Sequence, residues 1–356
     1  MKIYNFSPGP SILPKEVFEQ AAQGVLNLNG SGLSILEISH RSRDFTEIIT
    51  KARDLVRELL DVPKNYHILF LSGGASTQFL MSAMNLLPSN GTAAYLDTGS
   101  WSSKAIKEAK PYGNVDVIAS SKDRNYAYIP KGYKAPSEAL YLHLTSNNTI
   151  SGTQFHEFPE VNIPLVCDMS SDIFSRPVDV KRFGLIYAGA QKNMGPAGTT
   201  VVIIHDELVG QSERILPTIM DYQTHIDKDS MFNTPPVFPI YGSMLTMQWI
   251  KDNGGIAAAA ERNEKKASTL YAEIDRNSLF DGVVDKEDRS KMNVTFVMRD
   301  VANEAAFIDA ASEAGCMSIK GHRSVGGFRA SIYNAMTLEG VEKLVYVMQE
   351  FERANG

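Results

Sequence analysis

The strongest constraint on the fold is a series of short, continuous apolar segments separated by helical patterns. These segments occupy residues 67–71, 93–96, 115–119, 140–144, 165–167, 185–187 and 200–204. Strands that are apolar at every position are buried on both faces, as happens when helices cover both sides of a mostly parallel sheet. The sequence therefore predicts an α/β fold with a large domain built on a mostly parallel mixed sheet.

Two helices are expected near the start of the large domain. Residues 45–60 repeat apolar side chains at helical spacing, and a second helix is expected to end near Leu87.

The pattern changes after residue 239. Beyond residue 239 we expect a long helical stretch from 240 to about 274, strands at 292–298 and 327–333, and helices at 304–314 and 338–353. This region is an α+β unit of about 100 residues, a typical size for a small domain. We place the boundary at Gly254 and Gly255, so that residues 15–254 form the large domain and 255–356 the small C-terminal domain.

Composition narrows the class of protein. The 356 residues exceed the roughly 250–300 that one core usually supports. With 43% hydrophobic and 21% charged residues the chain is typical of soluble globular proteins. A formal net charge of -6 argues against a nucleic-acid partner, and no apolar run is long enough for a membrane span. Cys167 and Cys316 are the only cysteines, so we expect a reducing, cytoplasmic location.

Lys192 and Asp168 are the first candidates for chemistry. Lys192 follows the apolar segment 185–187 among small residues, and Asp168 ends the apolar segment 165–167. An amine and a carboxylate on neighbouring strand ends suit pyridoxal 5'-phosphate: the amine forms a Schiff base with its aldehyde, and the carboxylate keeps the pyridine nitrogen protonated. A buried Lys–Asp ion pair explains these two residues equally well.

A glycine-rich turn at residues 72–77 (SGGAST) lies between a strand and a helix. The unpaired first-turn amides and the dipole of such a helix favour an anion, and Ser76 and Thr77 add hydroxyl donors. An ordinary capped helix gives the same pattern. Together with Lys192 and Asp168, the turn is the expected seat of a cofactor phosphate.

Two further polar or aromatic positions follow predicted strands. Trp101 can stack on a flat ring, and Thr149, beside Asn148, can contact a ring oxygen. Ligands of open α/β sheets bind beyond the carboxyl ends of the strands, where both residues lie. A half-buried tryptophan and an ordinary turn residue are the simpler interpretations.

With these residues identified, the chain resembles the phosphoserine aminotransferases, pyridoxal phosphate enzymes of fold type I in the class V aminotransferase family. The resemblance spans nearly the whole chain. It rests on FSPGP (6–10), SHRS (39–42), GGASTQF (73–79), CDMSS (167–171), SRPVD (175–179), the lysine segment 188–198, MFNTPP (231–236), GHRSVGG (321–327) and RASIYNAM (329–336). Residues 112–136 match the family less clearly, and we assign them no function.

The resemblance implies a role for each cofactor-binding position. Lys192 is the Schiff-base lysine, Asp168 the partner of the pyridine nitrogen, Trp101 the stacking residue and Thr149 the neighbour of the ring oxygen. The phosphate is held by Ala75, Ser76 and Gln191, joined by Asn233 and Thr234 from the second subunit of a homodimer. Some relatives have arginine where this chain has Ser76. Residues 1–14 are expected to join the small domain.

The resemblance also implies the substrates. Arg41 and Arg329 receive substrate carboxylate, whereas His40, His322 and Arg323 serve the substrate phosphate. Guanidinium groups bind both anions in two-point fashion, although any one arginine can instead form a surface ion pair. The implied reaction is reversible amino transfer between L-glutamate and 3-phosphohydroxypyruvate, giving O-phospho-L-serine and 2-oxoglutarate. The family also acts on 4-phosphohydroxy-L-threonine in vitamin B6 synthesis.

Two other interpretations stay open on the residues alone. A cysteine desulfurase or an alanine–glyoxylate aminotransferase of the same fold type would share Lys192 and Asp168. A desulfurase needs a mobile nucleophilic cysteine, whereas Cys167 lies in a predicted strand and Cys316 follows no obvious loop. From a different class, the chain could be a non-catalytic phosphate-binding module with a buried Lys–Asp pair.

Overall fold

The computed structural model describes residues 2–356, which form two sheets of more than two strands and a set of covering helices. The strands are β1 (Tyr4–Asn5), β2 (Tyr66–Leu71), β3 (Thr92–Asp97), β4 (Asn114–Ser120), β5 (Leu142–Thr145), β6 (Leu165–Asp168), β7 (Phe183–Gly189), β8 (Thr200–His205), β9 (Phe280–Gly282), β10 (Asn293–Met298), β11 (Cys316–Met317) and β12 (Phe328–Ser331). The α-helices are α1 (Lys15–Leu26), α2 (Arg43–Leu59), α3 (Gly74–Leu86), α4 (Ser100–Ala109), α5 (Tyr222–Asp227), α6 (Val237–Asp252), α7 (Gly255–Arg276), α8 (Glu304–Glu313) and α9 (Leu338–Asn355).

The larger sheet has the strand order β2-β8-β7-β6-β5-β3-β4. Strand β8 runs antiparallel to both of its neighbours, and every other adjacent pair is parallel. The mostly parallel mixed sheet predicted from the apolar segments is therefore confirmed. Each of the seven predicted segments overlaps one of these strands, although β5 begins at Leu142 rather than at Leu140, which is exposed.

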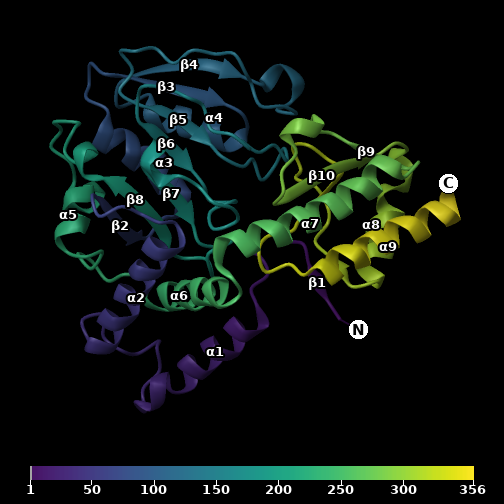
Figure 1. Cartoon of the computed structure of the whole chain (residues 1–356), viewed down its shortest axis with the longest axis horizontal. Coiled ribbons are helices and arrows are strands. Elements are labelled where there is room, and N and C mark those ends of the chain that lie inside the picture. Colours follow the sequence, from purple (N-terminus) through teal and green to yellow (C-terminus); the bar gives the residue numbers. More distant parts are fainter. Residues whose placement is uncertain (1) are drawn as a thin grey trace.

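Helices cover both faces of this sheet (Figure 1). On one face, Phe79 of α3 and Ile106 of α4 pack in one core with Tyr187 of β7. On the other face, Ile49 of α2 and Met247 of α6 belong to a second core. This double cover explains why the inner strands are apolar along most of their length, whereas the edge strand β4, which contains Asp116, is largely exposed.

The expected long helix between residues 240 and 274 is two helices. Helix α6 ends at Asp252 and α7 begins at Gly255, and between them Gly254 and Gly255 have φ values of 89° and 68°. Helical side-chain spacing continues across the break, which is why the pattern concealed it. Left-handed φ values are accessible to glycine without a steric penalty, so the two glycines turn the chain at this point.

A second, three-stranded antiparallel sheet has the order β12-β10-β9 and packs with α7, α8 and α9. Its core contains a cluster of aromatic rings: Phe280, Phe296, Phe307 and Phe328, with Phe280 and Phe307 centroids 4.8 Å apart. Phe6 joins this core, and strand β1 pairs with β11, so the first residues lie with the C-terminal part of the chain (Figure 1). The division of the chain into domains after residues 14 and 254 remains a prediction.

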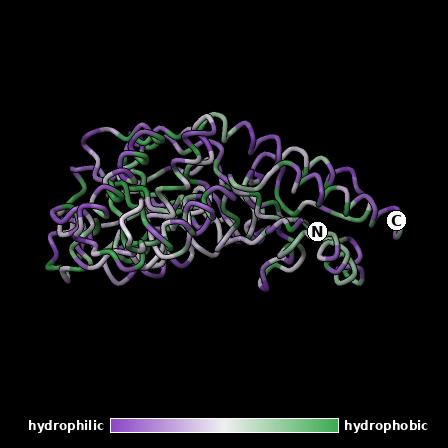
Figure 2. The backbone as a smooth tube through the Cα atoms, turned by 90° about the horizontal axis from the view of Figure 1, so that it is seen from below, coloured by the Kyte–Doolittle hydropathy of each residue, from purple (hydrophilic) through white to green (hydrophobic). Residues whose placement is uncertain are grey.

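Figure 2 shows hydrophobic segments in the middle of the larger body and hydrophilic segments along its outline. No helix among residues 2–356 combines the length and apolar character needed to cross a lipid bilayer. Within the same residues, no three or more His, Cys, Asp or Glu side chains are grouped so as to hold a metal ion.

We predict that Phe307→Ala lowers the free energy of unfolding by about 3–5 kcal/mol, because a fully buried ring leaves a cavity among its aromatic neighbours. Denaturant unfolding followed by circular dichroism measures the change. Tyr346→Ala, at a residue 53% exposed on α9, is the matched control and should stay near the wild-type value. Equal losses from both variants would contradict this account of the core.

Candidate active site

Lys192 lies in the turn between β7 and β8 and is buried, with 9% of its surface exposed. Its Nζ donates a hydrogen bond of 2.7 Å to Thr149 Oγ1. Small residues make this burial possible: a Cβ at Gly195 would lie 2.6 Å from Ser243 Oγ of α6, so only glycine lets the turn pack against that helix. The long lysine stem therefore ends in a protein interior rather than in solvent.

Asp168 ends β6 and is 4% exposed. Its Oδ1 accepts a hydrogen bond of 2.9 Å from the Ser170 backbone N–H. Burial raises the pKa of the Asp168 carboxyl group, and the charge of Lys192 opposes that rise. Burial likewise lowers the pKa of Lys192 from 10.5 to about 8, against the attraction of Asp168. Within residues 2–356 the two side chains form no ion pair; Lys192 is hydrogen-bonded to Thr149 instead.

Both side chains line one cavity of about 260 Å³. The cavity lies at the carboxyl ends of β5 and β6 and the N-terminus of α3, and β12 contributes one arginine. The predicted site residues that line it are Ala75, Ser76, Trp101, Thr149, Asp168, Gln191, Lys192, His322 and Arg329. Nine positions from distant parts of the sequence are thus brought to one place, on the scale of a small-molecule pocket.

One end of this cavity is formed by the start of α3. Gly73 precedes the helix with φ 98°, no side chain caps the helix, and a Cβ at Gly73 would lie 2.0 Å from Thr77 Oγ1. The first amides of an uncapped helix are unpaired donors, and Gly74, Ala75 and Ser76 of this turn face the cavity. The arrangement fits a phosphate group.

The remaining walls also carry polar atoms without partners. Trp101 Nε1, Thr145 Oγ1 and Arg329 Nε are buried and make no hydrogen bond within the described chain. Buried polar atoms are nearly always paired, so three unpaired ones around one cavity indicate a polar ligand. Trp101 lies in the first turn of α4, a helix that the strand pattern did not reveal, and Lys192 Nζ is 5.8 Å from its ring centroid. The residues present therefore fit pyridoxal phosphate.

Arg329 places a positively charged guanidinium group at the cavity. It is 7% exposed, and its NH1 donates to Thr149 O at 3.2 Å. Among residues 2–356 no carboxylate lies within ion-pair distance of its guanidinium group. A buried cation without a counter-ion is costly, and an anionic ligand removes that cost. Thr149 thus joins two functional groups, Lys192 through its hydroxyl and Arg329 through its carbonyl.

Five predicted site residues do not line this cavity. Arg41, Asn233, Thr234 and Arg323 are exposed, and His40 is half-buried. For Asn233 and Thr234 the prediction already required a second subunit. The roles of all five stay predictions.

Several cavity residues escaped the sequence reasoning. Thr145, Asn147, Ser170 and Ser171 line the cavity, and Tyr333 donates a hydrogen bond of 2.6 Å to Pro8 O beside it. The first four lie within a few residues of the end of a predicted strand, a position that could have drawn attention to them. Tyr333 gave no such local signal, since its contact is with a residue 325 positions away.

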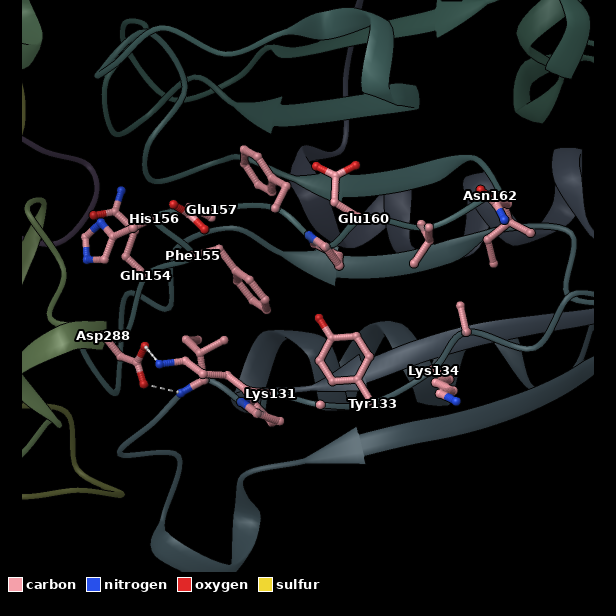
Figure 3. Close-up of a pocket in the computed structure, with 18 of the residues that line it drawn as sticks. Lys131, Tyr133, Lys134, Gln154, Phe155, His156, Glu157, Glu160, Asn162 and Asp288 are labelled. Carbon is pink, nitrogen blue, oxygen red and sulfur yellow. Dashed lines mark hydrogen bonds and ion pairs between the residues drawn. The ribbon is translucent and has the colours of Figure 1, made fainter.

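A larger hollow of about 790 Å³ is separate from this site and shares no residue with it. In Figure 3, Lys131 and Tyr133 stand opposite Phe155 and His156 across it. Some of its charged groups are paired, as in the ion pair of Lys131 with Glu287 at 2.5 Å, whereas Lys134 and Glu157 form no ion pair with the described residues. The cavity of Lys192, with its unpaired polar atoms, is the stronger candidate for chemistry.

Comparison with known proteins agrees with this geometry. The family model of class-V aminotransferases matches residues 3–344. A phosphoserine aminotransferase of Flavobacterium psychrophilum is 59% identical over 353 residues, covering 99% of each chain. The solved phosphoserine aminotransferase of Bacillus circulans subsp. alkalophilus is 46% identical, with a TM-score of 0.97 over 100% of this chain and 99% of that one.

A PLP-bound phosphoserine aminotransferase of Trichomonas vaginalis is 38% identical, with a TM-score of 0.92 over 98% of this chain and 100% of that one. The resemblance inferred from the sequence motifs is confirmed, and with it the fold type I architecture. This chain belongs to the class-V aminotransferase family.

Proposed function

We propose that this chain is a phosphoserine aminotransferase that uses pyridoxal phosphate. It transfers an amino group reversibly between L-glutamate and 3-phosphohydroxypyruvate, giving O-phospho-L-serine and 2-oxoglutarate. One observation carries the proposal: a buried amine, a buried carboxylate and a buried guanidinium group without a carboxylate partner among the described residues line the same small cavity. Full-length relatives named phosphoserine aminotransferase support the choice of substrates.

When bound, the cofactor supplies an electron-withdrawing ring that stabilises negative charge at the substrate α-carbon. Asp168 would hold the proton at the ring nitrogen, because its buried carboxylate has no cationic partner at ion-pair distance among the described residues. Trp101 supplies the stacking surface. The first turn of α3, with Ala75 and Ser76, and the neighbouring Gln191 hold the phosphate.

Lys192 acts as nucleophile and base. Its lowered pKa, about 8, leaves far more neutral amine near neutral pH than an ordinary lysine has. Its Nζ would be the base that takes the proton from the substrate α-carbon. A base held at the reacting atom avoids the entropy of a separate encounter.

Arg329 binds the substrate carboxylate that all four substrates share. Its planar fork suits two-point binding of that group, and its Nε is free to donate. His322 also lines the cavity, which supports its role at the substrate phosphate. Arg41, His40 and Arg323 complete the proposed anion contacts.

The described residues do not favour a cysteine desulfurase. Cys167 and Cys316 are both fully buried, and burial raises the pKa of the Cys316 thiol to about 11 and that of Cys167 well above its usual value. A thiol in such a setting is neither mobile nor ionised. Both cysteines are free, which agrees with the cytoplasmic location that we propose.

We further propose a homodimer in which Asn233 and Thr234 of one subunit complete the phosphate site of the other. Both residues are exposed and do not line the cavity of their own chain. Activity toward 4-phosphohydroxy-L-threonine is a further proposal, supported by the resemblance alone.

A panel of amino donors tests the function. With 2-oxoglutarate as acceptor, phosphoserine should be used, and serine, which lacks the phosphate, should be poorer by about 10⁴-fold in kcat/KM. Lys192→Ala should lose turnover in both directions, by about 10²–10⁴-fold for the lost base alone. Lys181→Ala, at an exposed lysine outside the cavity, is the control. Equal use of alanine or cysteine and phosphoserine would refute the proposed substrate.

The lowered pKa of Lys192 predicts its reactivity. In protein freed of cofactor, acetylation of Lys192 by acetic anhydride should rise with pH through a midpoint near 8 rather than 10.5, because only the neutral amine reacts. Peptide mass spectrometry across a pH series measures the modified fraction. A midpoint at the ordinary lysine value would show that burial does not perturb this amine.

Complementation between two inactive variants tests the shared site. A Lys192→Ala subunit and a Thr234→Asp subunit should each form inactive homodimers, since one lacks the amine and the other repels the phosphate. Co-expression should restore activity, because the mixed dimer holds one site with an intact Lys192 and an intact Thr234. Sedimentation analysis confirms the dimer. Failure of the mixture to exceed the two variants alone would exclude sharing.

A further inference from the structure

The N-terminal motif FSPGP (6–10) has no part in the function proposed above. We infer that residues 7–11 form a strap that positions Lys192, so that its amine stays at the substrate α-carbon during proton transfer. Ser11, Gly9 and Tyr333 are the positioning residues. This inference rests on the proposed function.

The strap is bonded directly to the lysine turn. Ser11 N–H donates to Gln191 O at 3.0 Å, and Ser11 Oγ donates to Lys192 O at 2.6 Å. The two bonds occupy the backbone carbonyls of consecutive residues in the turn. They restrain the point from which the lysine side chain starts.

Gly9 limits the lysine side chain itself. A Cβ on Gly9 would lie 3.3 Å from Lys192 Cγ and 3.4 Å from Gln191 Cγ, which is tighter than most van der Waals contacts. Gly9 also has φ 141°, in the region that favours glycine. The backbone of the strap therefore lies against the lysine stem, and only a residue without a side chain allows that approach.

The other end of the strap is bonded to strands β11 and β12. Phe6 N–H donates to Met317 O at 3.0 Å, and Phe6 O accepts from Ser331 N–H at 3.2 Å. Tyr333 OH donates to Pro8 O at 2.6 Å, in the middle of the strap. Met317 of β11, Ser331 of β12 and Tyr333 just beyond β12 thus hold the strap in place.

These contacts connect the base to the group that binds substrate. Arg329 and Ser331 are on β12, and Ser331 holds Phe6 while Arg329 holds Thr149, the hydroxyl partner of Lys192. A substrate bound by its carboxylate at Arg329 has its α-carbon at a fixed distance from β12. The strap fixes Lys192 relative to the same strand, so base and α-carbon keep a constant separation.

A free amine on a four-carbon stem otherwise samples many rotamers. Restricting the stem raises the fraction of time that Nζ spends in reach of the proton, which increases the rate of proton transfer without new contacts to substrate. Loss of the strap should therefore lower kcat by slowing proton transfer, with little effect on substrate binding.

The test uses the loaded enzyme with L-glutamate and its α-deuterated form. Gly9→Ala, Ser11→Ala and Tyr333→Phe should lower kcat, by up to about 10²-fold for the displaced stem in Gly9→Ala, with little change in KM. The isotope effect on kcat should increase, because proton transfer becomes more rate-limiting. The pH midpoint of the visible absorption change of the loaded enzyme should also move, as a readout independent of turnover.

Matched controls separate positioning from stability. Gly210→Ala replaces an exposed glycine with φ 80° and open space around it, and Tyr66→Phe removes a buried hydroxyl that donates to Phe183 O at 2.8 Å. Both should keep the wild-type isotope effect and absorption midpoint. If the strap contributes only to stability, its variants contain a smaller fraction of active enzyme but keep the wild-type isotope effect and absorption midpoint. That result overturns the inference.

Two further outcomes are distinguishable. If Gly9→Ala does not fold, Ser11→Ala and Tyr333→Phe decide, because each removes only one hydroxyl. If wild-type enzyme shows no transamination of glutamate, the proposed function fails before the strap is tested. If wild-type enzyme is active and the variants keep its isotope effect and absorption midpoint, only the inference about the strap is refuted.

Discussion

The site depends on the burial of two cations away from any carboxylate at ion-pair distance within the described chain. Lys192 and Arg329 are both nearly inaccessible, and the nearest partner that they share is Thr149, which offers a hydroxyl to one and a carbonyl to the other. Burial without a counter-ion favours the neutral amine of Lys192, the form that reacts with an aldehyde. Arg329 keeps its charge, and that charge is satisfied only by an anion from outside the chain.

The two sheets contribute different parts of this arrangement. Strands β5 and β6 are parallel, so their carboxyl ends bring Thr145 and Asp168 to one edge, where register pairs them directly. Strand β12 belongs to the antiparallel sheet and brings Arg329 from the other side. Thr145 and Asp168 therefore reach the cavity from the larger sheet and Arg329 from the three-stranded sheet, and the proposed strap of residues 7–11 lies between these two contributions.

Most of the positions proposed to bind cofactor line the cavity, whereas of those proposed to bind substrate only His322 and Arg329 do. Lys192, Asp168 and the turn before α3 each carry a local signal: a functional residue or glycine pair directly after an apolar strand. The break at Gly254 and Gly255 was hidden because helical spacing continues through it. Tyr333 and Ser11 act through contacts between distant segments, which no local pattern reports. Exposed residues such as Asn233 acquire a role only if a second subunit covers them.

Residues beside the site form a hydrogen-bonded network, whereas several polar atoms in the cavity have no partner within the described chain. Asn293 Oδ1 accepts from Asn147 at 2.8 Å, and its Nδ2 donates to Ser331 Oγ at 2.9 Å and Tyr333 OH at 3.1 Å. Such a buried network is stabilising only when every member is satisfied, and it then permits one arrangement of the two sheets. A hydrogen-bonded network of this kind helps to keep Lys192 and Arg329 away from carboxylates, since a softer pocket would relax to neutralise them.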